Sequence, residues 1–541
     1  MPPSVIFDDD GTRLGFDADE QEAIASVLAD MNDDTAAGQN DTEIWDDDLA
    51  AEAAVREAYA SLDGVTWKKE ELVPVKLEHN AQIDEALAAL LVRRGHVFIT
   101  GSAGTGKSTL LRYFLQNCGD QQTVVLAPTG VAALNVGGET IHHFMRIGPM
   151  ATRGDVFSAA RRLVRAHETK LYESVDALII DEISMVRADL FDFLDLFLRL
   201  VRGNERPFGG VRLICFGDLY QLPPVVKGDE REAFEEEYET PFFFSSQVFD
   251  RLQRDRRVPL EYIQLQKIYR QTDERFISLL QEIRTQSITP ERLALLNERV
   301  LDDGRVDDLA GDFVVLTATK ARAEAINNYH LECLPGRVRA YLANQDGKFP
   351  DSSRPTLERL RLKKGARVML LNNHPKGAWV NGTMGEIEAM YRDFVLVKLD
   401  GGETVKVDVY TWENYHAVFN PVKQTIEREK VGEFSQLPLK LAWAVTIHKA
   451  QGQTFERLAI DLGRGAFAGG QTYVALSRGT SLEGICLARP LRPEDICCDQ
   501  HILRFYQELE NLEYFGESTY GRFTNKPKRK KSQQGVQETI L

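Results

Sequence analysis

The chain has 541 residues, 43% of them hydrophobic, and a formal net charge of −17. This length exceeds what one hydrophobic core usually supports, so we expect two to four domains. No apolar run approaches the roughly 20 residues that span a bilayer, and the acidic N-terminus lacks the basic start and apolar block of a signal peptide. We therefore expect neither export nor a membrane partner.

The six cysteines include no Cys-x-x-Cys pair, which argues against a zinc module. Scattered cysteines of this kind are typical of reduced proteins. We therefore expect an intracellular protein, cytoplasmic and nucleoid-associated in preference, or nuclear if the source is a eukaryote.

The negative charge is concentrated at the N-terminus. Residues 1–50 contain fifteen acidic residues and one basic residue, Arg13, so they carry −14 of the net charge. A nearly neutral remainder can still carry a basic groove, so the total charge does not exclude nucleic acid. We expect residues 1–72 to form an acidic, largely disordered segment, which could bind a partner protein.

Two series of continuous apolar runs follow, and helical stretches separate the runs. This pattern is typical of parallel sheets covered by helices on both faces. We expect a first α/β domain over 73–262 and a second over 263–361 and 437–515. The expected strands are Val97–Ile99, Val124–Leu126, Ala177–Ile180 and Leu213–Phe216 in the first domain, and Phe313–Leu316, Leu441–Ile447, Leu458–Ile460 and Tyr473–Leu476 in the second.

Three further segments differ from this pattern. Residues 362–436 alternate apolar and polar side chains between glycine-rich turns, which predicts a small inserted β-barrel. Residues 146–172 are expected to form an insertion in the first domain. The tail, 516–541, contains the basic run Lys526–Lys531, which could be a nuclear-import signal, a phosphate contact or a solvated tail.

A glycine-rich loop follows the first expected strand and leads into the expected helix Thr109–Gln116. In this context backbone N–H groups surround a β-phosphate, Lys107 reaches the β- and γ-phosphates, and the Ser108 hydroxyl binds Mg²⁺. The sequence thus predicts ATP and Mg²⁺ as ligands. The expected nucleotide-binding residues here are Gly101, Gly104, Thr105, Gly106, Lys107, Ser108 and Thr109.

Two acidic residues end the third expected strand of the first domain, Ala177–Ile180. Asp181 is placed to hold Mg²⁺, and Glu182 to orient and deprotonate an attacking water. Alone, an apolar run ending in two acids is as readily a solvated loop. Together with the glycine-rich loop it favours nucleotide hydrolysis.

The fourth expected strand ends in the segment Gly217–Pro224. Gln221 can sense a γ-phosphate because its amide both donates and accepts hydrogen bonds. The alternative is that it caps a loop.

Two arginines, Arg270 and Arg478, are candidates for stabilising the transition state of hydrolysis. Both fall in the expected second domain, where we expect them to reach across a cleft to the γ-phosphate. The alternative for each is an ordinary surface residue.

In this order, these segments closely resemble those of superfamily 1B helicases, specifically the petite-integration-frequency family, with RecD-type and Dda-type helicases as relatives. The resemblance runs from about residue 97 to 485. The matching blocks are the glycine-rich loop, Ala127–Ala133, Gly138–Phe144, Asp181–Met185, Pro207–Gly210, Gly217–Val225, Tyr269–Gln271, Trp379–Gly382, Pro438–Thr454 and Tyr473–Arg478.

The resemblance implies two RecA-like P-loop NTPase domains, with an Src-homology-3-like barrel inserted in the second. It implies single-strand DNA contacts at Thr129, Gly130, Thr140 and His142 in the first domain and at Thr446, His448 and Lys449 in the second. It also implies that Gly452 and Gln453 link DNA to the γ-phosphate. Gln82, which precedes the glycine-rich loop, is the candidate for reading adenine.

We therefore expect an ATP-dependent DNA helicase, a monomeric motor that binds single-stranded and forked DNA in repair, recombination or replication. The resemblance implies 5′-to-3′ movement. For such a helicase we expect the element that parts the duplex in residues 146–172 and the barrel. Two alternatives stay open. One is a translocase that strips proteins without unwinding DNA, and the other is a motor that acts on RNA.

Overall fold

The structure, a computed structural model, describes residues 77–514 except 94, 120, 227, 229, 255–257, 259 and 302–310, together with a short antiparallel pair, β1 (Ile6–Phe7) and β2 (Arg13–Leu14). Apart from that pair, the expected acidic segment lies outside the described residues, as does the basic run Lys526–Lys531. Among the helices of the described part, none is both long and apolar enough to cross a membrane.

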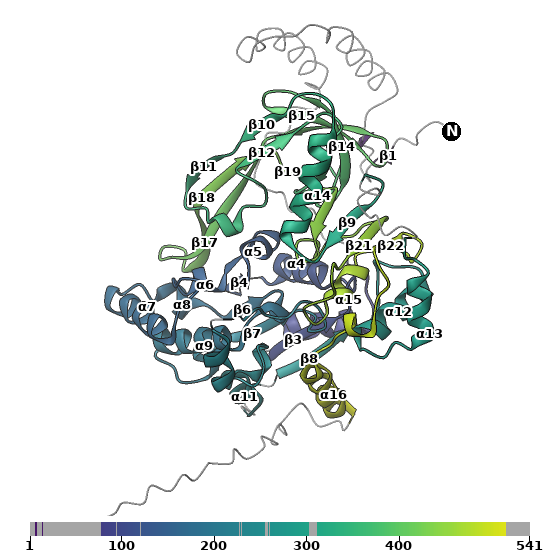
Figure 1. The fold of residues 1–541 in the computed structure, drawn as a ribbon. Helices are drawn as coiled ribbons and strands as arrows, with labels where there is room; N and C mark the ends of the chain where they lie inside the picture. Colours follow the sequence, from purple (N-terminus) through teal and green to yellow (C-terminus); the bar gives the residue numbers. More distant parts are fainter. Residues whose placement is uncertain are drawn as a thin grey trace, which may run out of the picture.

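The first motor domain is built on a six-stranded, all-parallel sheet with the order β5-β4-β6-β7-β3-β8 (Figure 1). Alternate residues of β3 serve two cores: Val97 and Ile99 pack with helix α4, whereas Phe98 packs with helix α9 on the other face. The strands are β3 (His96–Gly101), β4 (Thr123–Ala127), β5 (Glu139–Thr140), β6 (Ala177–Ile180), β7 (Arg212–Phe216) and β8 (Leu260–Leu265).

Helices cover both faces of this sheet, as the continuous apolar strands predict. The helices of this domain are α3 (Ala81–Leu87) with a π-helical extension (Ala88–Val92), α4 (Lys107–Asn117), α5 (Gly130–Asn135), α6 (Ile141–Phe144), α7 (Arg153–Ala166), α8 (Lys170–Ser174), α9 (Ala188–Arg202), α10 (Arg231–Glu237) and α11 (Gln247–Arg254). The four strands predicted for this domain are confirmed, and α4 confirms the predicted helix.

The predicted boundary between residues 262 and 263 is wrong, because it cuts β8. This strand pairs in parallel with β3 over its whole length and completes the first sheet. As an edge strand it is only partly buried, and its alternating sequence lacks the continuous apolar run that marks the central strands.

The second motor domain carries a four-stranded parallel sheet with the order β20-β9-β21-β22. Its elements are β9 (Val314–Thr317), β20 (Ala444–Thr446), β21 (Leu458–Asp461) and β22 (Ile485–Leu487), with α12 (Glu274–Arg284), α13 (Pro290–Asn297), α14 (Lys320–Cys333) and α15 (Gln471–Leu476).

The prediction of a strand at Tyr473–Leu476 is wrong, since these residues belong to helix α15. Every residue of α15 is buried, so the helix has no polar face to mark a 3.6-residue period. The fourth strand is instead β22, which lies further along the chain.

The insertion in the second domain contains three separate sheets. A five-stranded antiparallel sheet, ordered β16-β15-β14-β13-β19, contains four of the strands that fall in the range predicted for a barrel, β13 to β16. The long hairpin β17–β18 pairs instead with β11, and β10 pairs with β12. The strands are β10 (Arg339–Leu342), β11 (Asn344–Gly347), β12 (Arg359–Leu362), β13 (Arg367–Leu370), β14 (Met384–Met390), β15 (Phe394–Leu399), β16 (Thr404–Asp408), β17 (Tyr410–Asn420), β18 (Thr425–Gln436) and β19 (Leu439–Leu441).

The insertion therefore extends beyond the predicted limits of 362 and 436. Strands β10 and β11 lie before residue 362, and β19 lies after residue 436. Such long-range pairing, for example Asn344 with Ser435, leaves no local sequence signal.

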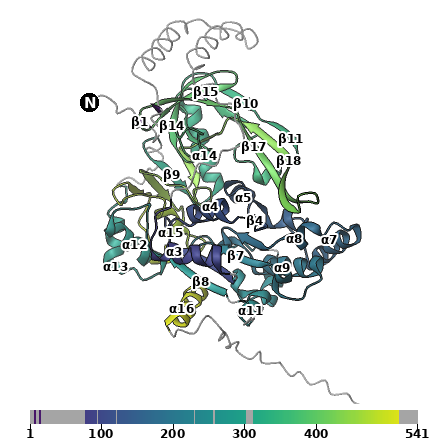
Figure 2. The same cartoon turned by 180° about the vertical axis from the view of Figure 1, so that it is seen from behind.

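The hairpin β17–β18 also reaches down to α6 and α8 of the first domain (Figures 1 and 2). Its residues Ala417, Phe419 and Ile426 pack against the first-domain core.

The C-terminal helix α16 (Gln500–Tyr514) packs on the first motor domain, beneath β8 (Figure 1). The Phe505 ring stacks on Phe244 with 4.4 Å between centroids. The Tyr506 hydroxyl lies 2.8 Å from that of Thr100. Residues 500–514, which the sequence placed in the second domain, thus contribute to the first.

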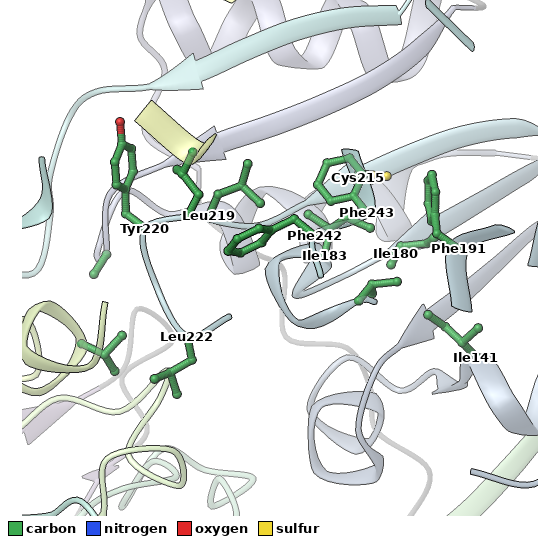
Figure 3. Packing of buried hydrophobic residues seen from close by; sticks show 14 of the residues in the cluster. Ile141, Ile180, Ile183, Phe191, Cys215, Leu219, Tyr220, Leu222, Phe242 and Phe243 are labelled. Atoms are coloured by element: carbon green, nitrogen blue, oxygen red, sulfur yellow. The ribbon is translucent and has the colours of Figure 1, made fainter. Parts of the chain in front are cut away.

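A cluster of buried apolar side chains anchors the loops that follow β6 and β7 (Figure 3). Ile183 stands beside Glu182, while Leu219 and Leu222 flank Gln221, and all three apolar residues have no exposed surface. Close packing of this kind fixes the backbone that carries the neighbouring polar residues.

Candidate nucleotide and nucleic-acid sites

The glycine-rich loop connects β3 to α4. Gly106 caps α4 with φ 85°, a left-handed conformation that favours glycine. At Gly104, also left-handed, a Cβ would lie 2.6 Å from the Cβ of Arg270. The Lys107 ammonium donates to the carbonyls of Gly101 (2.7 Å) and Ser102 (3.0 Å). The loop thus has the conformation and the cation that a phosphate site needs.

The two carboxylates that follow β6, Asp181 and Glu182, lie at the same edge of the parallel sheet as this loop, because the carboxyl ends of β3 and β6 meet there. Burial raises the pKa of Glu182 to about 7, and the neighbouring charge of Asp181 adds to the shift. Burial likewise raises the pKa of Asp181, while Lys107 lowers it. Glu182 has φ 52°, which is uncommon for a residue with a side chain and marks a strained backbone.

The residues present fit Mg²⁺ bound together with phosphates. Ser108 is exposed at the start of α4, and the Asp181 carboxylate offers the hard oxygen that Mg²⁺ prefers. In the described part of the chain, no group of three or more His, Cys, Asp or Glu side chains could hold a metal by itself. Such a shared site is usual for Mg²⁺, which is commonly held by one or two protein oxygens plus phosphates.

Gln221 lies at the interface between the two motor domains. Its amide donates to Asp218 Oδ2 at 3.3 Å, and its carbonyl oxygen accepts from Gln451 at 3.2 Å. Gln451 also donates to Glu182 Oε2 at 3.1 Å. One glutamine from the second domain therefore contacts both the sensor candidate and the base candidate of the first.

Arg270 belongs to the segment that leaves the first domain, contrary to the expectation that it lies in the second. The preceding amide, of Tyr269, donates to the Gly104 carbonyl at 2.8 Å, which attaches this segment to the phosphate loop. The Arg270 guanidinium donates to the carbonyls of Ser477 and Gly452, each at 3.3 Å. Arg270 therefore reaches from the first domain toward the second.

Arg478 follows α15 and is 1% exposed. It donates to the Val474 carbonyl at 3.0 Å, the Ser477 hydroxyl at 2.8 Å and the Gln453 carbonyl at 3.5 Å. Burial, and then the nearby Arg270 charge, lower the pKa of Arg478 to about 9. Neither arginine pairs with a carboxylate within the described residues, so two cations share a buried region that suits a polyanion.

Gln82 lies near the mouth of the phosphate loop. Its amide donates to Gln266 at 3.1 Å, and Asn80 donates to the Tyr269 hydroxyl at 3.1 Å. The Tyr269 ring is 3.7 Å from where a Cβ of Gly106 would be. Thr105 has a local role, donating to the Ser102 carbonyl at 2.9 Å, and Thr109 lies in the first turn of α4.

The first-domain candidates for strand binding lie at the carboxyl ends of β4 and β5. Thr129 caps α5 by accepting from the Ala132 amide at 3.3 Å, and Thr140 caps α6 by accepting from the His143 amide at 3.2 Å. Burial lowers the pKa of His142.

The second-domain candidates follow β20 in the same way. Thr446 accepts from the Lys449 amide at 3.2 Å. Burial lowers the pKa of both His448 and Lys449, and the Lys320 charge further lowers that of Lys449. The carboxyl ends of both sheets thus carry hydroxyl and basic groups, but each threonine already caps its own loop.

Residues 76–292 match the family model described as PIF1-like helicase. The human ATP-dependent DNA helicase PIF1 is 37% identical over 446 residues, which cover 79% of this chain and 64% of the human protein. A Bacteroides sp. Pif1 solved in complex with ADP-AlF4 is 36% identical, and the match covers 83% of this chain and 100% of that one with a TM-score of 0.72. This chain belongs to the PIF1-like helicase family. Like the solved Pif1 structure, it contains two RecA-like motor domains.

A second Bacteroides Pif1 structure, bound to ssDNA, is 35% identical over 83% of this chain and 100% of that one, with a TM-score of 0.56. The chain spans about two thirds of the length of its human PIF1-like relative.

The sequence did not indicate three residues that the structure brings to this PIF1-like cleft. Gln451 was missed because two glutamines, Gln451 and Gln453, flank the same glycine, and the spacing does not say which one faces the first domain. Asp218 and Arg284 form a buried ion pair of 2.9 Å beside Gln221. The run Gly217–Pro224 could have suggested Asp218, whereas nothing around Arg284 marks it.

Proposed function

We propose that this chain is an ATP-dependent DNA helicase that moves 5′ to 3′ along single-stranded DNA and unwinds duplex DNA in repair, recombination or replication. The observation that carries the proposal is the pair of contacts from Gln451 to Glu182 and Gln221. Gln451 closely follows the strand-binding candidates Thr446, His448 and Lys449. One short segment therefore connects the nucleotide site to the candidate DNA contacts.

For hydrolysis, the loop amides and Lys107 would bind the phosphates, and Ser108 and Asp181 would hold Mg²⁺. When bound, Mg²⁺ would offset the negative charge of the phosphate oxygens. Glu182 would accept a proton from the attacking water, and a pKa of about 7 suits a base at neutral pH. Gln82 would hydrogen-bond the adenine edge beside Tyr269.

Arg270 and Arg478 would stabilise charge that develops on the γ-phosphate. They approach the loop from opposite sides of the interface, so both would be in place only when the domains are closed. An arginine in this role, called an arginine finger, raises the rate of hydrolysis about 10³- to 10⁵-fold. Hydrolysis would then depend on domain closure, with Gly452 and Gln453 contributing the carbonyls that receive the two arginines.

The DNA partner is proposed from the strand-end groups and from the relative solved with ssDNA. Hydroxyls, backbone amides and a few cations grip phosphates without reading sequence. Single-stranded and forked DNA are the proposed ligands, and a monomer is the proposed motor. The projecting segment that contains α7, together with the insertion, is the proposed site of duplex parting.

The test is unwinding of duplexes with either a 5′ or a 3′ single-stranded tail. We expect ATP-dependent opening only with the 5′ tail. Efficient opening of 3′-tailed duplexes would contradict the direction. Movement without opening would indicate a translocase, and stronger ATPase stimulation by RNA of matched sequence would indicate an RNA motor.

A further inference from the structure

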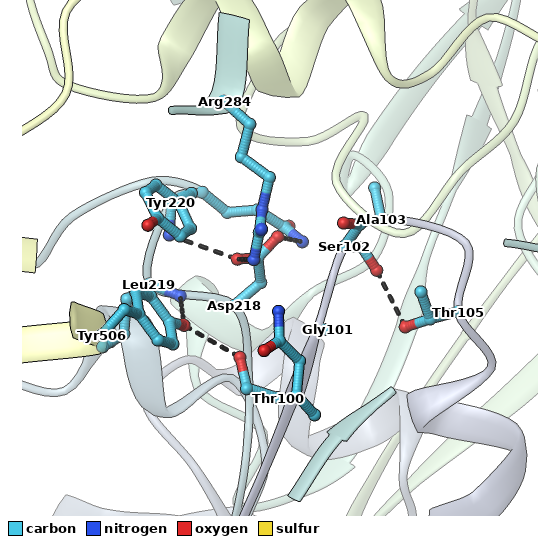
Figure 4. Close-up of polar contacts among 12 residues, drawn as sticks. Thr100, Gly101, Ser102, Ala103, Thr105, Asp218, Leu219, Tyr220, Arg284 and Tyr506 are labelled. Atoms are coloured by element: carbon cyan, nitrogen blue, oxygen red, sulfur yellow. Dashed lines mark hydrogen bonds and ion pairs between the residues drawn. The ribbon is translucent and has the colours of Figure 1, made fainter. Parts of the chain in front are cut away.

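The Asp218 carboxylate, which has no exposed surface, collects hydrogen bonds from both motor domains (Figure 4). From its own loop it accepts from the Tyr220 amide at 3.3 Å and from the Gln221 side chain at 3.3 Å. From the second domain it accepts from Arg284 at 2.9 Å and from the Tyr473 hydroxyl at 3.4 Å. Asp218 therefore holds the Gln221 amide and is itself held by α12 and α15.

Arg284, the last residue of α12, is 5% exposed and lies over the Tyr220 ring, 4.1 Å from its centroid. Tyr220 in turn stacks on Tyr506 of α16 with 4.8 Å between centroids. One turn earlier on α12, Gln281 donates to the Ser102 hydroxyl of the phosphate loop at 2.8 Å. The same helix thus contacts both the phosphate loop and the loop that carries Gln221.

Arg284 belongs to a group of charged residues around Lys107. Asp181, Glu182 and Asp218 all act on Lys107, and Arg284 opposes them. Without Arg284, Asp218 would be an uncompensated buried carboxylate, which is strongly unfavourable. It would compete for Lys107 and repel the γ-phosphate.

We propose that Arg284 is a positioning residue for ATP hydrolysis. By neutralising Asp218, it lets this carboxylate orient Gln221 without placing a net negative charge beside the γ-phosphate. This inference rests on the proposed ATPase function. The competing explanation is that the ion pair only fastens α12 to the first domain.

The two explanations differ in how they treat nucleotides. A misplaced negative charge discriminates against a γ-phosphate, whereas a loosened helix weakens ADP and ATP alike. We would measure the affinities of the full-length protein for ADP and for a non-hydrolysable ATP analogue. The kcat and KM of DNA-stimulated hydrolysis and the melting temperature would be measured alongside.

Arg284→Ala should weaken the affinity for the analogue at least ~10-fold relative to that for ADP. It should also lower kcat by about 10²- to 10³-fold, the range seen when one preorganised polar group is lost. Arg284→Lys keeps the charge but not the planar contact, so it should keep the affinity ratio and lose only ~3- to 10-fold in kcat. The neutral pair Asp218→Asn/Arg284→Gln should recover the ratio to within ~3-fold of the wild-type value, because no buried charge remains.

The matched control is Arg292→Ala. Arg292 pairs with Glu282 at 3.0 Å on the exposed side of the same helix pair and should leave the ratio unchanged. An unchanged ratio in Arg284→Ala would overturn the proposal, whatever its melting temperature. If Arg284→Ala does not fold, the double variant Asp218→Asn/Arg284→Gln decides. An affinity for the analogue relative to ADP that is ~10-fold below the wild-type value in this double variant would also overturn the proposal. A wild-type chain that hydrolyses no ATP refutes the proposed function instead, because the affinity ratio does not depend on turnover.

Discussion

Two of the contacts between the first and second domains, the nucleotide cleft and the hairpin β17–β18, differ in character. At the nucleotide cleft the contacts are polar and buried, with Asp218 0% and Arg478 1% exposed. At the hairpin β17–β18 the contacts are only partly buried: Ala417, Phe419 and Ile426 pack against the first domain, the Ala417 amide donates to Glu139 at 3.3 Å, and the Ile426 amide donates to Gln122 at 2.6 Å.

This difference indicates which contact opens. A buried polar network is stable when complete and costly when partly broken, so the cleft should behave as a unit. The hairpin contact is made by half-buried side chains, so it should open at a lower free-energy cost than the fully buried cleft. Gly130 packs so tightly on the insertion that a Cβ there would lie 2.0 Å from the Ser353 hydroxyl. DNA could reach Gly130 only if the insertion moved away.

The largest expected effect lies in the cleft. Lys107→Ala should abolish nearly all DNA-stimulated ATP hydrolysis while leaving the fold intact, because it removes the main cation of the phosphate site. Steady-state ATPase assays and circular dichroism check this, with the exposed Lys170→Ala as control. Turnover above about a tenth of wild type would refute the assignment of the phosphate loop, since a missing primary phosphate cation costs far more than tenfold.

The next largest effect concerns the two arginines. Arg270→Ala and Arg478→Ala should each lower kcat at least ~10³-fold with much smaller changes in ATP affinity, since a finger acts on charge that develops in the transition state. Single-turnover kinetics with parallel nucleotide titrations separate the two parameters, and the exposed Arg161→Ala serves as control. Normal hydrolysis by either variant would mean that its arginine serves only the interface.

The same contrast separates what the sequence could predict from what it could not. The phosphate loop and the Asp181–Glu182 pair stand directly at the ends of buried strands, so short-range patterns place them correctly. Residues that act across the interface do not follow local patterns. Arg284 meets Asp218 across 66 positions and Gln451 meets Glu182 across 269, and the sequence marks neither pair. The buried helix α15 was mistaken for a strand for the related reason that full burial removes the pattern.

A smaller effect is expected at the hairpin. Gln122→Ala removes the acceptor of the Ile426 amide. Because a hydrogen bond contributes about 0.5–1.5 kcal/mol, the equilibrium constant for detachment of the hairpin from the first domain should rise about 2- to 10-fold. Association with single-stranded DNA should accelerate by a similar factor, while ATPase without DNA stays unchanged. Stopped-flow binding of a labelled strand measures this. The neighbouring Gln121→Ala is the matched control, and an unchanged or slower association would show that the hairpin does not limit access.

The smallest expected effect is that of the acidic N-terminus, which carries −14 of the −17 net charges in residues 1–50. A tethered polyanion competes with DNA for the same lysines and arginines, at an effective concentration in the range of about 1 mM. Deleting residues 1–50 should therefore tighten single-strand binding roughly two- to fivefold at about 50 mM salt. Since the Debye length is about 10 Å at 0.1 M salt and shrinks as salt rises, the gain should largely vanish at about 300 mM.

Titrating labelled single strands with the full-length and shortened proteins at both salt concentrations measures this gain. A second variant, in which the fifteen acidic residues of 1–50 become Asn or Gln, keeps the length and removes the charge. It should behave like the deletion if charge is responsible. If all three proteins bind equally at low salt, the segment does not compete with DNA, and binding of a partner protein becomes the proposal for it. If only the deletion tightens binding, the segment acts by its bulk, because charge is then not needed.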